Sequence, residues 1–312
     1  MGETTVANAT DWPVREPITD GDLPTRMLVL GLARHDGTIL ASDAFPVADA
    51  CGRSPEQLRS CLRRLVSEGL FTRDGVGQNA VYRATDTGLA VLGAVTARAR
   101  LAHVQDVRGR GWDGRWHLVA FAIPEARRWA RDELRDQLGR LGGAAVHNGL
   151  YVSPHPWEKD VIAAAEGVAA SGHVTLASAD DLAVGGVSDP PAVAARLWPL
   201  DRLAGRYRSF LDRWSHIPAD LDTMRRRHES LPDSAFLPGA LAMGLAYQAC
   251  FDDDPLLPPE LLPQPWPGRA ARELLVASRR RALQIRAQHN RPALFRSFDD
   301  LIDALPDHRE DP

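Results

Sequence analysis

The chain is poor in lysine and has a small net charge. Lys159 is the only lysine among 312 residues, so nearly every basic residue is an arginine. The sequence is also rich in alanine, which together with arginine indicates the codon bias of a GC-rich genome. A single arginine is therefore weaker support for phosphate binding here than in most proteins. The formal net charge is -4, so only the local distribution of charge bears on nucleic-acid binding.

Cysteines, long apolar segments and targeting signals are also scarce. Cys51, Cys61 and Cys250 form no close pair and have no histidine at metal-ligand spacing, which argues against a disulfide framework or a structural zinc site. No apolar stretch approaches the length that crosses a bilayer, and the N-terminus lacks a basic and then apolar signal peptide. We expect a cytoplasmic protein without a membrane partner, metal or cofactor.

The composition changes along the chain predict an α+β protein in four parts. A polar leader with Pro13 and Pro17 precedes a first domain. A second, mixed domain and a mostly helical C-terminal domain follow. The predicted limits are 1–21 for the leader, 22–108 for the first domain, 112–187 for the middle domain and 190–312 for the C-terminal domain.

The first domain is predicted to fold as helix, short strand, helix, helix and hairpin. Its first helix covers 24–34 and its short strand 38–41. Ser42 or Asp43 is expected to cap the second helix and to place Pro46 in its first turn. Strands are expected at 70–73 and 80–84, with Asp74-Gly75 and Gly77 at the bend. Thr85 is expected to cap a further helix toward Arg100.

The third helix carries the clearest local signals. Ser54 is a favourable N-cap, Pro55 fits the first helical position and Gln57 completes a capping box, while Gly69 ends the helix. Apolar residues at helical spacing predict one buried stripe, formed by Leu58, Cys61, Leu62 and Leu65.

This order of elements is typical of a winged helix-turn-helix, whose recognition helix enters the major groove of double-stranded DNA. From Arg53 to Arg83, six arginines face three acidic residues, a local net charge of +3. The residues expected near base edges are Arg53, Gln57, Arg59, Ser60 and Arg63, with Ser54 capping the helix beside them. Arg64 and Ser67 are expected at phosphates, and Arg73, Gln78 and Asn79 at the wing. The alternative is a winged-helix domain that contacts protein through a solvated arginine face.

The middle domain is predicted to be ferredoxin-like, with the order βαββαβ. Strands are expected at 116–123, 144–147, 150–153 and 174–178, and helices at 125–141 and 158–170. Asn148-Gly149 marks a tight hairpin. In the C-terminal domain, helices are expected at about 191–216, 219–229, 233–251, 268–289 and 297–305. The segment Pro255–Pro267 holds six prolines and cannot be helical.

An ordered set of segments resembles the PaaX family, repressors of phenylacetate-degradation operons. The resemblance runs from about residue 22 to about 285. It is carried by residues 62–70 (LRRLVSEGL), 82–88 (YRATDTG), 112–119 (WDGRWHLV), 123–125 (IPE), 131–135 (RDELR), 148–154 (NGLYVSP), 204–211 (AGRYRSFL) and 254–268, which begins Asp-Pro and ends PQPWPG.

The resemblance implies a homodimeric regulator on palindromic operator DNA, usually a repressor, which an aromatic acyl-CoA such as phenylacetyl-CoA releases. Such an effector needs aromatic residues for its acyl group and arginines for its phosphates. Candidates for these roles are Trp112, Arg115, Trp116, Arg206, Tyr207 and Arg208. The alternative is that the tryptophans only pack domain against domain.

The sequence motifs that could indicate catalysis lack the neighbouring elements or residues that the chemistry needs. Residues 109–114 read G-x-G-x-x-G, but a helix precedes and a strand follows, the reverse of a dinucleotide site, so we interpret them as a linker. The first strand of the middle domain lacks the carboxylate that a metal-dependent nuclease of this fold needs. His147, His155 and His173 match no ligand spacing. We therefore expect no enzyme, with a nuclease or thioesterase as the remote alternative.

Overall fold

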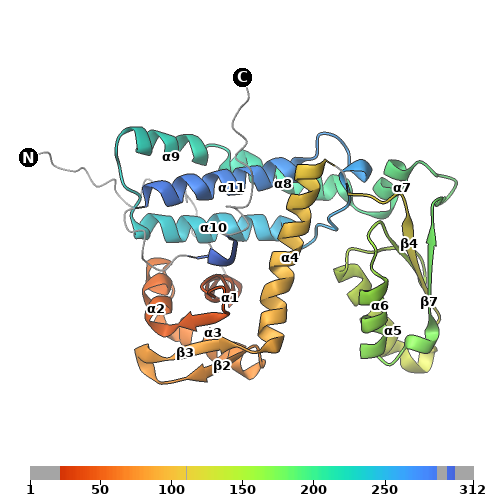
Figure 1. Ribbon diagram of the computed structural model, residues 1–312, viewed down its shortest axis with the longest axis horizontal. Helices are drawn as coiled ribbons and strands as arrows, with labels where there is room; N and C mark the ends of the chain where they lie inside the picture. Colours follow the sequence, from red (N-terminus) through yellow and green to blue (C-terminus); the bar gives the residue numbers. More distant parts are fainter. Residues whose placement is uncertain (1–21, 110, 287–293, 299–312) are drawn as a thin grey trace, which may run out of the picture. The chain divides into compact units, whose positions relative to one another are not determined.

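The computed structural model describes residues 22–109, 111–286 and 294–298. It is a mixed α+β structure with two small separate sheets and a helical C-terminal part, as predicted (Figure 1). The winged helix-turn-helix at the N-terminus stays a prediction. The chain divides into two compact units. One takes in residues up to 100, 209–249 and those from 270 on, and the other takes in 101–208 and 250–269. This division into two units does not test the four predicted domain limits, which remain predictions.

The N-terminal elements follow the predicted order of helix, strand, helix, helix and hairpin. The three strands form an antiparallel sheet in the order β1-β3-β2, and a short 3-10 turn lies at the tip of the β2–β3 hairpin. The elements are α1 (Asp22–Gly31), β1 (Thr38–Leu40), α2 (Ala41–Ala50), α3 (Pro55–Ser67), β2 (Phe71–Asp74), η1 (Gly77–Asn79) and β3 (Val81–Ala84).

The predicted start of α2 was wrong. The helix begins directly after β1 at Ala41, and its N-cap residue Leu40 makes no side-chain cap bond. The Ala41 N–H donates instead to the carbonyl of Ala80 on the hairpin, at 2.9 Å, so a tertiary hydrogen bond replaces the cap. Pro46 is consequently the sixth residue of the helix and lies beyond the first turn. Asp43, one of the two predicted caps, accepts a hydrogen bond from Arg34 at 2.9 Å.

A long helix, α4 (Asp86–Arg108), leaves the hairpin and runs past its predicted end at Arg100. Its start is fixed as predicted, because the Gly88 N–H donates to Thr85 Oγ1 at 3.1 Å. Thr85 also donates its hydroxyl to the carbonyl of Gly69 at 2.6 Å. One threonine therefore both caps α4 and ties it to the turn that follows α3.

The middle part has the predicted βαββαβ order. All its strand pairs are antiparallel, and the sheet order β5-β6-β4-β7 is that of a ferredoxin-like fold. Gly149 adopts φ 78° at the predicted hairpin. Helices α5 and α6 pack together and cover one face of the sheet (Figure 1). The elements are β4 (Trp116–Phe121), η2 (Glu125–Arg127), α5 (Arg128–Arg140), β5 (Ala144–His147), β6 (Leu150–Ser153), α6 (Glu158–Gly167), η3 (Ser171–His173) and β7 (Val174–Ala179).

The C-terminal part is helical, with one break that the sequence analysis missed. The single helix predicted at 191–216 is two helices, because Pro199 lacks an N–H and holds Trp198 in an extended conformation. Of the helix predicted at 297–305, residues from 299 on lie outside the described residues. The elements are α7 (Pro190–Leu197), α8 (Leu200–Trp214), α9 (Ile217–Arg226), α10 (Asp233–Phe251), η4 (Pro259–Leu261), α11 (Pro267–Ile285) and η5 (Arg296–Phe298).

Helix α10 corrects the expectation that no segment reaches membrane-spanning length. By length and composition alone it could cross a bilayer, and half of its most apolar stretch is buried within the protein. A core helix of a globular protein has the same composition, because a helix surrounded by other elements is apolar on most of its faces. One such helix among the described residues is therefore weak support for a membrane span.

Candidate nucleic-acid interface

Helix α3 is fixed at both ends by the residues that predicted it. The Gln57 N–H donates to Ser54 Oγ at 3.2 Å, and the Ser54 N–H donates to Gln57 Oε1 at 2.9 Å, which completes the capping box. Gly69 adopts φ 72° just after the helix, the left-handed conformation that ends it without strain. The helix therefore presents its side chains in a defined register.

The buried and exposed faces of α3 are those the sequence predicted. The apolar stripe Leu58, Cys61, Leu62 and Leu65 is buried. On the opposite face Arg63 and Ser67 are exposed and Ser60 is half-buried. Arg59 and Arg64 are exposed on the two flanks of this face.

Three predicted site residues already make hydrogen bonds within α3 or to the helix before it. Gln57 uses its side-chain oxygen in the capping box, so it cannot also offer the oxygen and nitrogen pair that recognises adenine. The Ser67 hydroxyl donates to the carbonyl of Arg64 at 2.9 Å. Arg53 is half-buried, and its backbone N–H donates to the carbonyl of Ala48 at 2.8 Å. The side chains of Gln57 and Ser67 therefore stabilise α3, and the backbone of Arg53 ties the start of α3 to α2.

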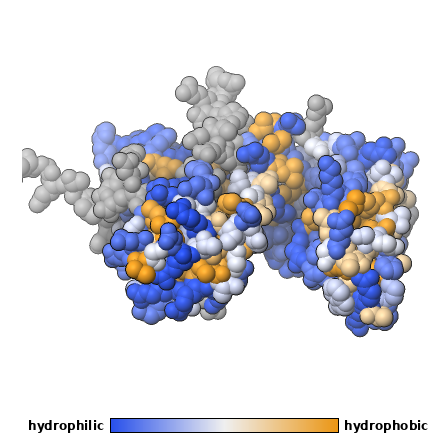
Figure 2. All heavy atoms as spheres, turned by 60° about the horizontal axis from the view of Figure 1, so that its bottom comes forward, coloured by the Kyte–Doolittle hydropathy of each residue, from blue (hydrophilic) through white to orange (hydrophobic). Residues whose placement is uncertain are grey.

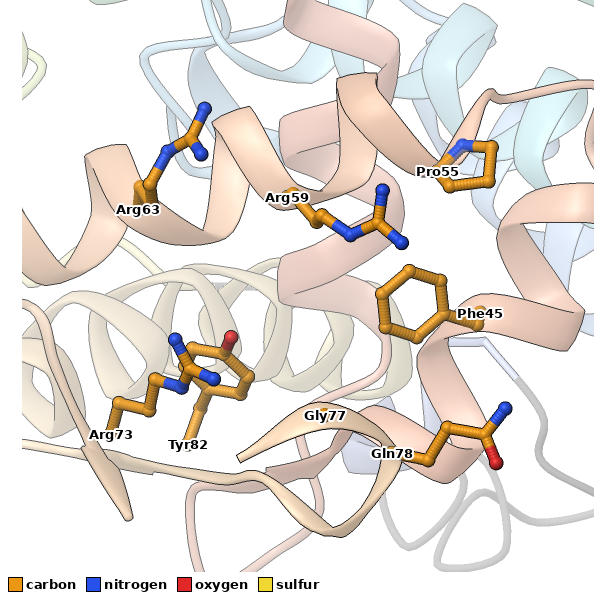
Figure 3. A pocket seen from close by; sticks show the side chains of 8 residues that line it. All are labelled: Phe45, Pro55, Arg59, Arg63, Arg73, Gly77, Gln78 and Tyr82. Carbon is orange, nitrogen blue, oxygen red and sulfur yellow. The ribbon is translucent and has the colours of Figure 1, made fainter. Parts of the chain in front are cut away.

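A pocket of about 290 Å³ lies between α3 and the β2–β3 hairpin (Figure 3). It brings together two predicted helix residues, Arg59 and Arg63, and two predicted wing residues, Arg73 and Gln78. Its remaining lining residues are Phe45, Pro55, Gly77 and Tyr82. The lining thus holds three arginines and no carboxylate, so the pocket favours an anion.

The three arginines of the pocket differ in how firmly they are held. The Arg59 guanidinium lies 5.4 Å from the centre of the Phe45 ring and 3.3 Å from Glu56 Oε1. Both groups of that ion pair are more than half exposed, so the pair is weak and a phosphate can compete with Glu56. The side chains of Arg63 and Arg73 make no hydrogen bond or ion pair among the described residues. Their charges are therefore available to a ligand.

The outer face of this region is largely polar. Figure 2 brings the hairpin end of the first unit forward and shows mainly hydrophilic atoms with separate hydrophobic patches. At the hairpin tip Gln78 and Asn79 are exposed, and Val76 is 79% exposed. Such a surface suits a charged, hydrated partner better than an apolar one.

The candidate effector residues form two packed groups. In one, the Trp112 and Trp116 rings lie 5.3 Å apart, Trp116 stacks on Trp198 at 6.5 Å, and Arg115 donates to the Ser178 hydroxyl at 3.1 Å. In the second group, Tyr207 donates its hydroxyl to Asp254 Oδ2 at 2.7 Å, and Arg206 pairs with Asp253.

Burial limits what these groups can offer to an effector. Trp116 is 1% exposed and Tyr207 is fully buried, whereas Arg115 and Arg208 are exposed. The two buried aromatic rings therefore serve packing, as the alternative interpretation expected. The exposed arginines are the members of the set that can reach a ligand in this conformation.

One titratable cluster was not singled out from the sequence. His117, on β4, lies between Glu158 Oε1 at 2.6 Å and Asp113 Oδ2 at 3.2 Å. Burial alone would raise the pKa of Glu158, but the hydrogen bond with His117, backbone hydrogen bonds and the nearby His117 charge together outweigh burial and lower that pKa. The described residues contain no group of three or more histidine, cysteine or acidic side chains that could hold a metal ion.

Comparison with known proteins identifies the middle and C-terminal parts. The model of the PaaX protein central Cas2-like domain matches residues 109–193, and the model of the PaaX-like protein C-terminal domain matches residues 198–291. Together these ranges cover more than half of the chain. They include the ferredoxin-like sheet and the helices from α8 to α11.

Similarity also extends over most of the chain. The transcriptional repressor PaaX of Escherichia coli (strain K12) is 25% identical over 264 residues, which are 83% of this chain and 79% of the repressor. The uncharacterized protein Rv0674 of Mycobacterium tuberculosis has a similar fold, with a TM-score of 0.51 and 22% identity, over 83% of this chain and 96% of that structure. The chain therefore belongs to the PaaX-like family of transcriptional regulators.

Proposed function

We propose that the chain is a repressor that binds double-stranded operator DNA through a winged helix-turn-helix within residues 22–108. The observation that carries this proposal is the pocket between α3 and the hairpin, where three arginines meet without a carboxylate. A capped helix with an exposed arginine face beside a two-stranded hairpin fits the major groove and the adjacent backbone. The protein then acts by binding rather than by catalysis.

In this proposal α3 is the recognition helix. Arg63 lies on the exposed face of α3 and is free to pair with a base edge, and Ser60 lies on the same face. Ser54 and Gln57 hold the helix start. Arg64 and Ser67, the predicted phosphate contacts, lie further along the helix, while Arg73, Gln78 and Asn79 belong to the wing.

A homodimer is the assembly we propose, since a two-fold operator calls for two recognition helices. Helix α4 supports it, because this helix exposes apolar residues that a monomer would leave in water. Val91 is 39% exposed and Val95, one turn later, is 37% exposed. A second copy could cover this stripe.

We further propose release by a small anionic effector, of which an aromatic acyl-CoA is the class that the family resemblance implies. Arg115 and Arg208 are exposed, and a phosphate could compete with the exposed Asp180, which lies 3.4 Å from Arg115. Because Trp116 and Tyr207 are buried, an acyl group would reach them only after a rearrangement. A repressor works on the chromosome, so we place this chain in the cytoplasm.

The test compares the affinity of Arg63→Ala for promoter DNA with that of a control variant, Arg128→Ala, which also loses one positive charge. Arg128→Ala removes an arginine from α5, where the side chain is 69% exposed. We expect Arg63→Ala to weaken binding to promoter DNA by about tenfold or more, since a bidentate base contact contributes about 1–3 kcal/mol of discrimination. Arg128→Ala should bind like the wild type. Equal affinity of the two variants for promoter DNA would refute the assignment of α3.

A further inference from the structure

Tyr82 is a largely buried side chain that carries its hydroxyl to the pocket between α3 and the hairpin. The residue is 8% exposed, and its side chain makes no hydrogen bond within the described part of the chain. It nevertheless lines the pocket between α3 and the hairpin. The ring is buried, but the hydroxyl is not among the fully buried atoms that lack a partner, so it opens into the pocket. A ligand oxygen bound in the pocket could therefore be its hydrogen-bond partner.

Arg73 lies directly opposite Tyr82 across the β2–β3 ladder. Paired residues point to the same face of a sheet, and Figure 3 shows the Arg73 guanidinium beside the Tyr82 hydroxyl. The hairpin thus offers a cationic donor and a neutral donor side by side. The sequence analysis named Arg73 and missed Tyr82, although strand alternation puts both on one face.

The opposite wall of the pocket comes from α3. Arg59 projects from this helix and is held over the Phe45 ring. The donors of helix and hairpin therefore face one space that no carboxylate lines. An anion with several oxygen atoms could bind both walls at once, since each guanidinium offers several N–H donors in one plane.

We propose that Arg73 and Tyr82, with Arg59 opposite, hold one phosphate of the DNA backbone in this pocket. The inference rests on the proposed function and adds the point at which α3 and the hairpin would be anchored along the DNA backbone. A phosphate bound between α3 and the hairpin would lock both elements onto one point of the backbone. It would orient Arg63 toward the groove while reading no sequence itself.

The experiment uses three variants of the full chain. Tyr82→Phe removes only the hydroxyl, and Arg73→Gln removes one charge from the same face of the hairpin. Arg83→Gln is the matched control, because Arg83 is exposed and, by strand alternation, lies on the other face of the same hairpin. Fluorescence anisotropy would measure affinity for promoter DNA and for unrelated DNA over a range of salt concentrations. Thermal unfolding would check that each variant is folded.

Tyr82→Phe should weaken binding to both DNAs by a similar factor of about ten, the value of a hydrogen bond to a charged group. It should leave the salt dependence unchanged. Arg73→Gln should weaken both as well and reduce the slope of log affinity against log salt by about 0.9, the contribution of one phosphate contact. Arg83→Gln should change neither affinity nor slope.

Two results would overturn the inference. One is wild-type affinity of Tyr82→Phe for both DNAs. The other is a loss in Tyr82→Phe confined to promoter DNA, which would mean a base contact. The proposed function fails separately, if the wild type itself does not prefer promoter DNA to unrelated DNA.

Discussion

Gly88 lies where α4 crosses the turn after α3, and no side chain fits there. A Cβ added at Gly88 would lie 2.0 Å from the carbonyl oxygen of Leu70, which is backbone and cannot rotate away. That carbonyl also accepts a hydrogen bond from the Thr85 N–H at 3.0 Å. Gly88→Ala must therefore push α4 away from the α3–β2 turn and strain the contacts that fix its start.

The magnitude follows from three terms. Overpacking against fixed atoms costs about 1–3 kcal/mol. Weakening one hydrogen bond adds about 1 kcal/mol. Replacing glycine by alanine inside a helix returns about 1 kcal/mol. We expect a net loss of about 1–3 kcal/mol in the free energy of unfolding, which lowers Tm by several degrees.

Gly93→Ala is the matched control in the same helix. A Cβ at Gly93 meets nothing within 4 Å, so only the helix propensity changes. It should stabilise the protein by about 0.5–1 kcal/mol. Thermal unfolding of the full chain, followed by circular dichroism, compares the two. A Gly88→Ala variant that melts at or above the temperature of Gly93→Ala would refute the close crossing at this point.

Three further predictions concern other parts of the chain. Val95→Asp should shift a homodimer toward monomer in sedimentation velocity, because it puts a charge on the exposed apolar stripe of α4; an unchanged dimer would exclude this face. Burial lowers the pKa of His155, whose ring donates a hydrogen bond to the Leu256 carbonyl at 2.7 Å. The contribution of His155 to stability is therefore full above its ordinary pKa of about 6.5 and is lost as the pH falls from 6.5 through the lowered pKa of the folded state. His155→Gln should flatten the decline of stability between pH 7 and pH 5 in urea titrations, and an equally steep decline would contradict the assignment. Gly31→Ala should cost about 1 kcal/mol by displacing the Phe295 ring, which lies 2.7 Å from the added Cβ, and the cost should vanish in a Phe295→Ala background.

Local chemistry made α3 and the β5–β6 hairpin predictable. In α3 the cap, the first-turn proline, the apolar stripe and the terminal glycine all favour the same helix, so no tertiary contact was needed to place it. Asn148-Gly149 defines the hairpin in the same way. These signals involve residues close together in sequence.

Errors occurred where distant residues decide the structure. The start of α2 depends on the hydrogen bond from Ala41 to Ala80, which lie far apart in sequence. The cluster of His117 with Asp113 and Glu158 joins a strand to a helix that follows much later. Tyr82 escaped notice because an apolar ring on an inner strand face predicts core packing. Only its position beside Arg73 and opposite Arg59 makes it a candidate ligand.

The central claim is sequence-specific DNA binding, and one titration tests it most directly. Fluorescence anisotropy would follow the full chain binding to DNA from its own promoter region, with random DNA as competitor, at several salt concentrations and with or without phenylacetyl-CoA. The account predicts saturable, salt-sensitive binding that random DNA does not displace. Binding no tighter than to random DNA under every condition would contradict it and favour a protein-interaction adaptor.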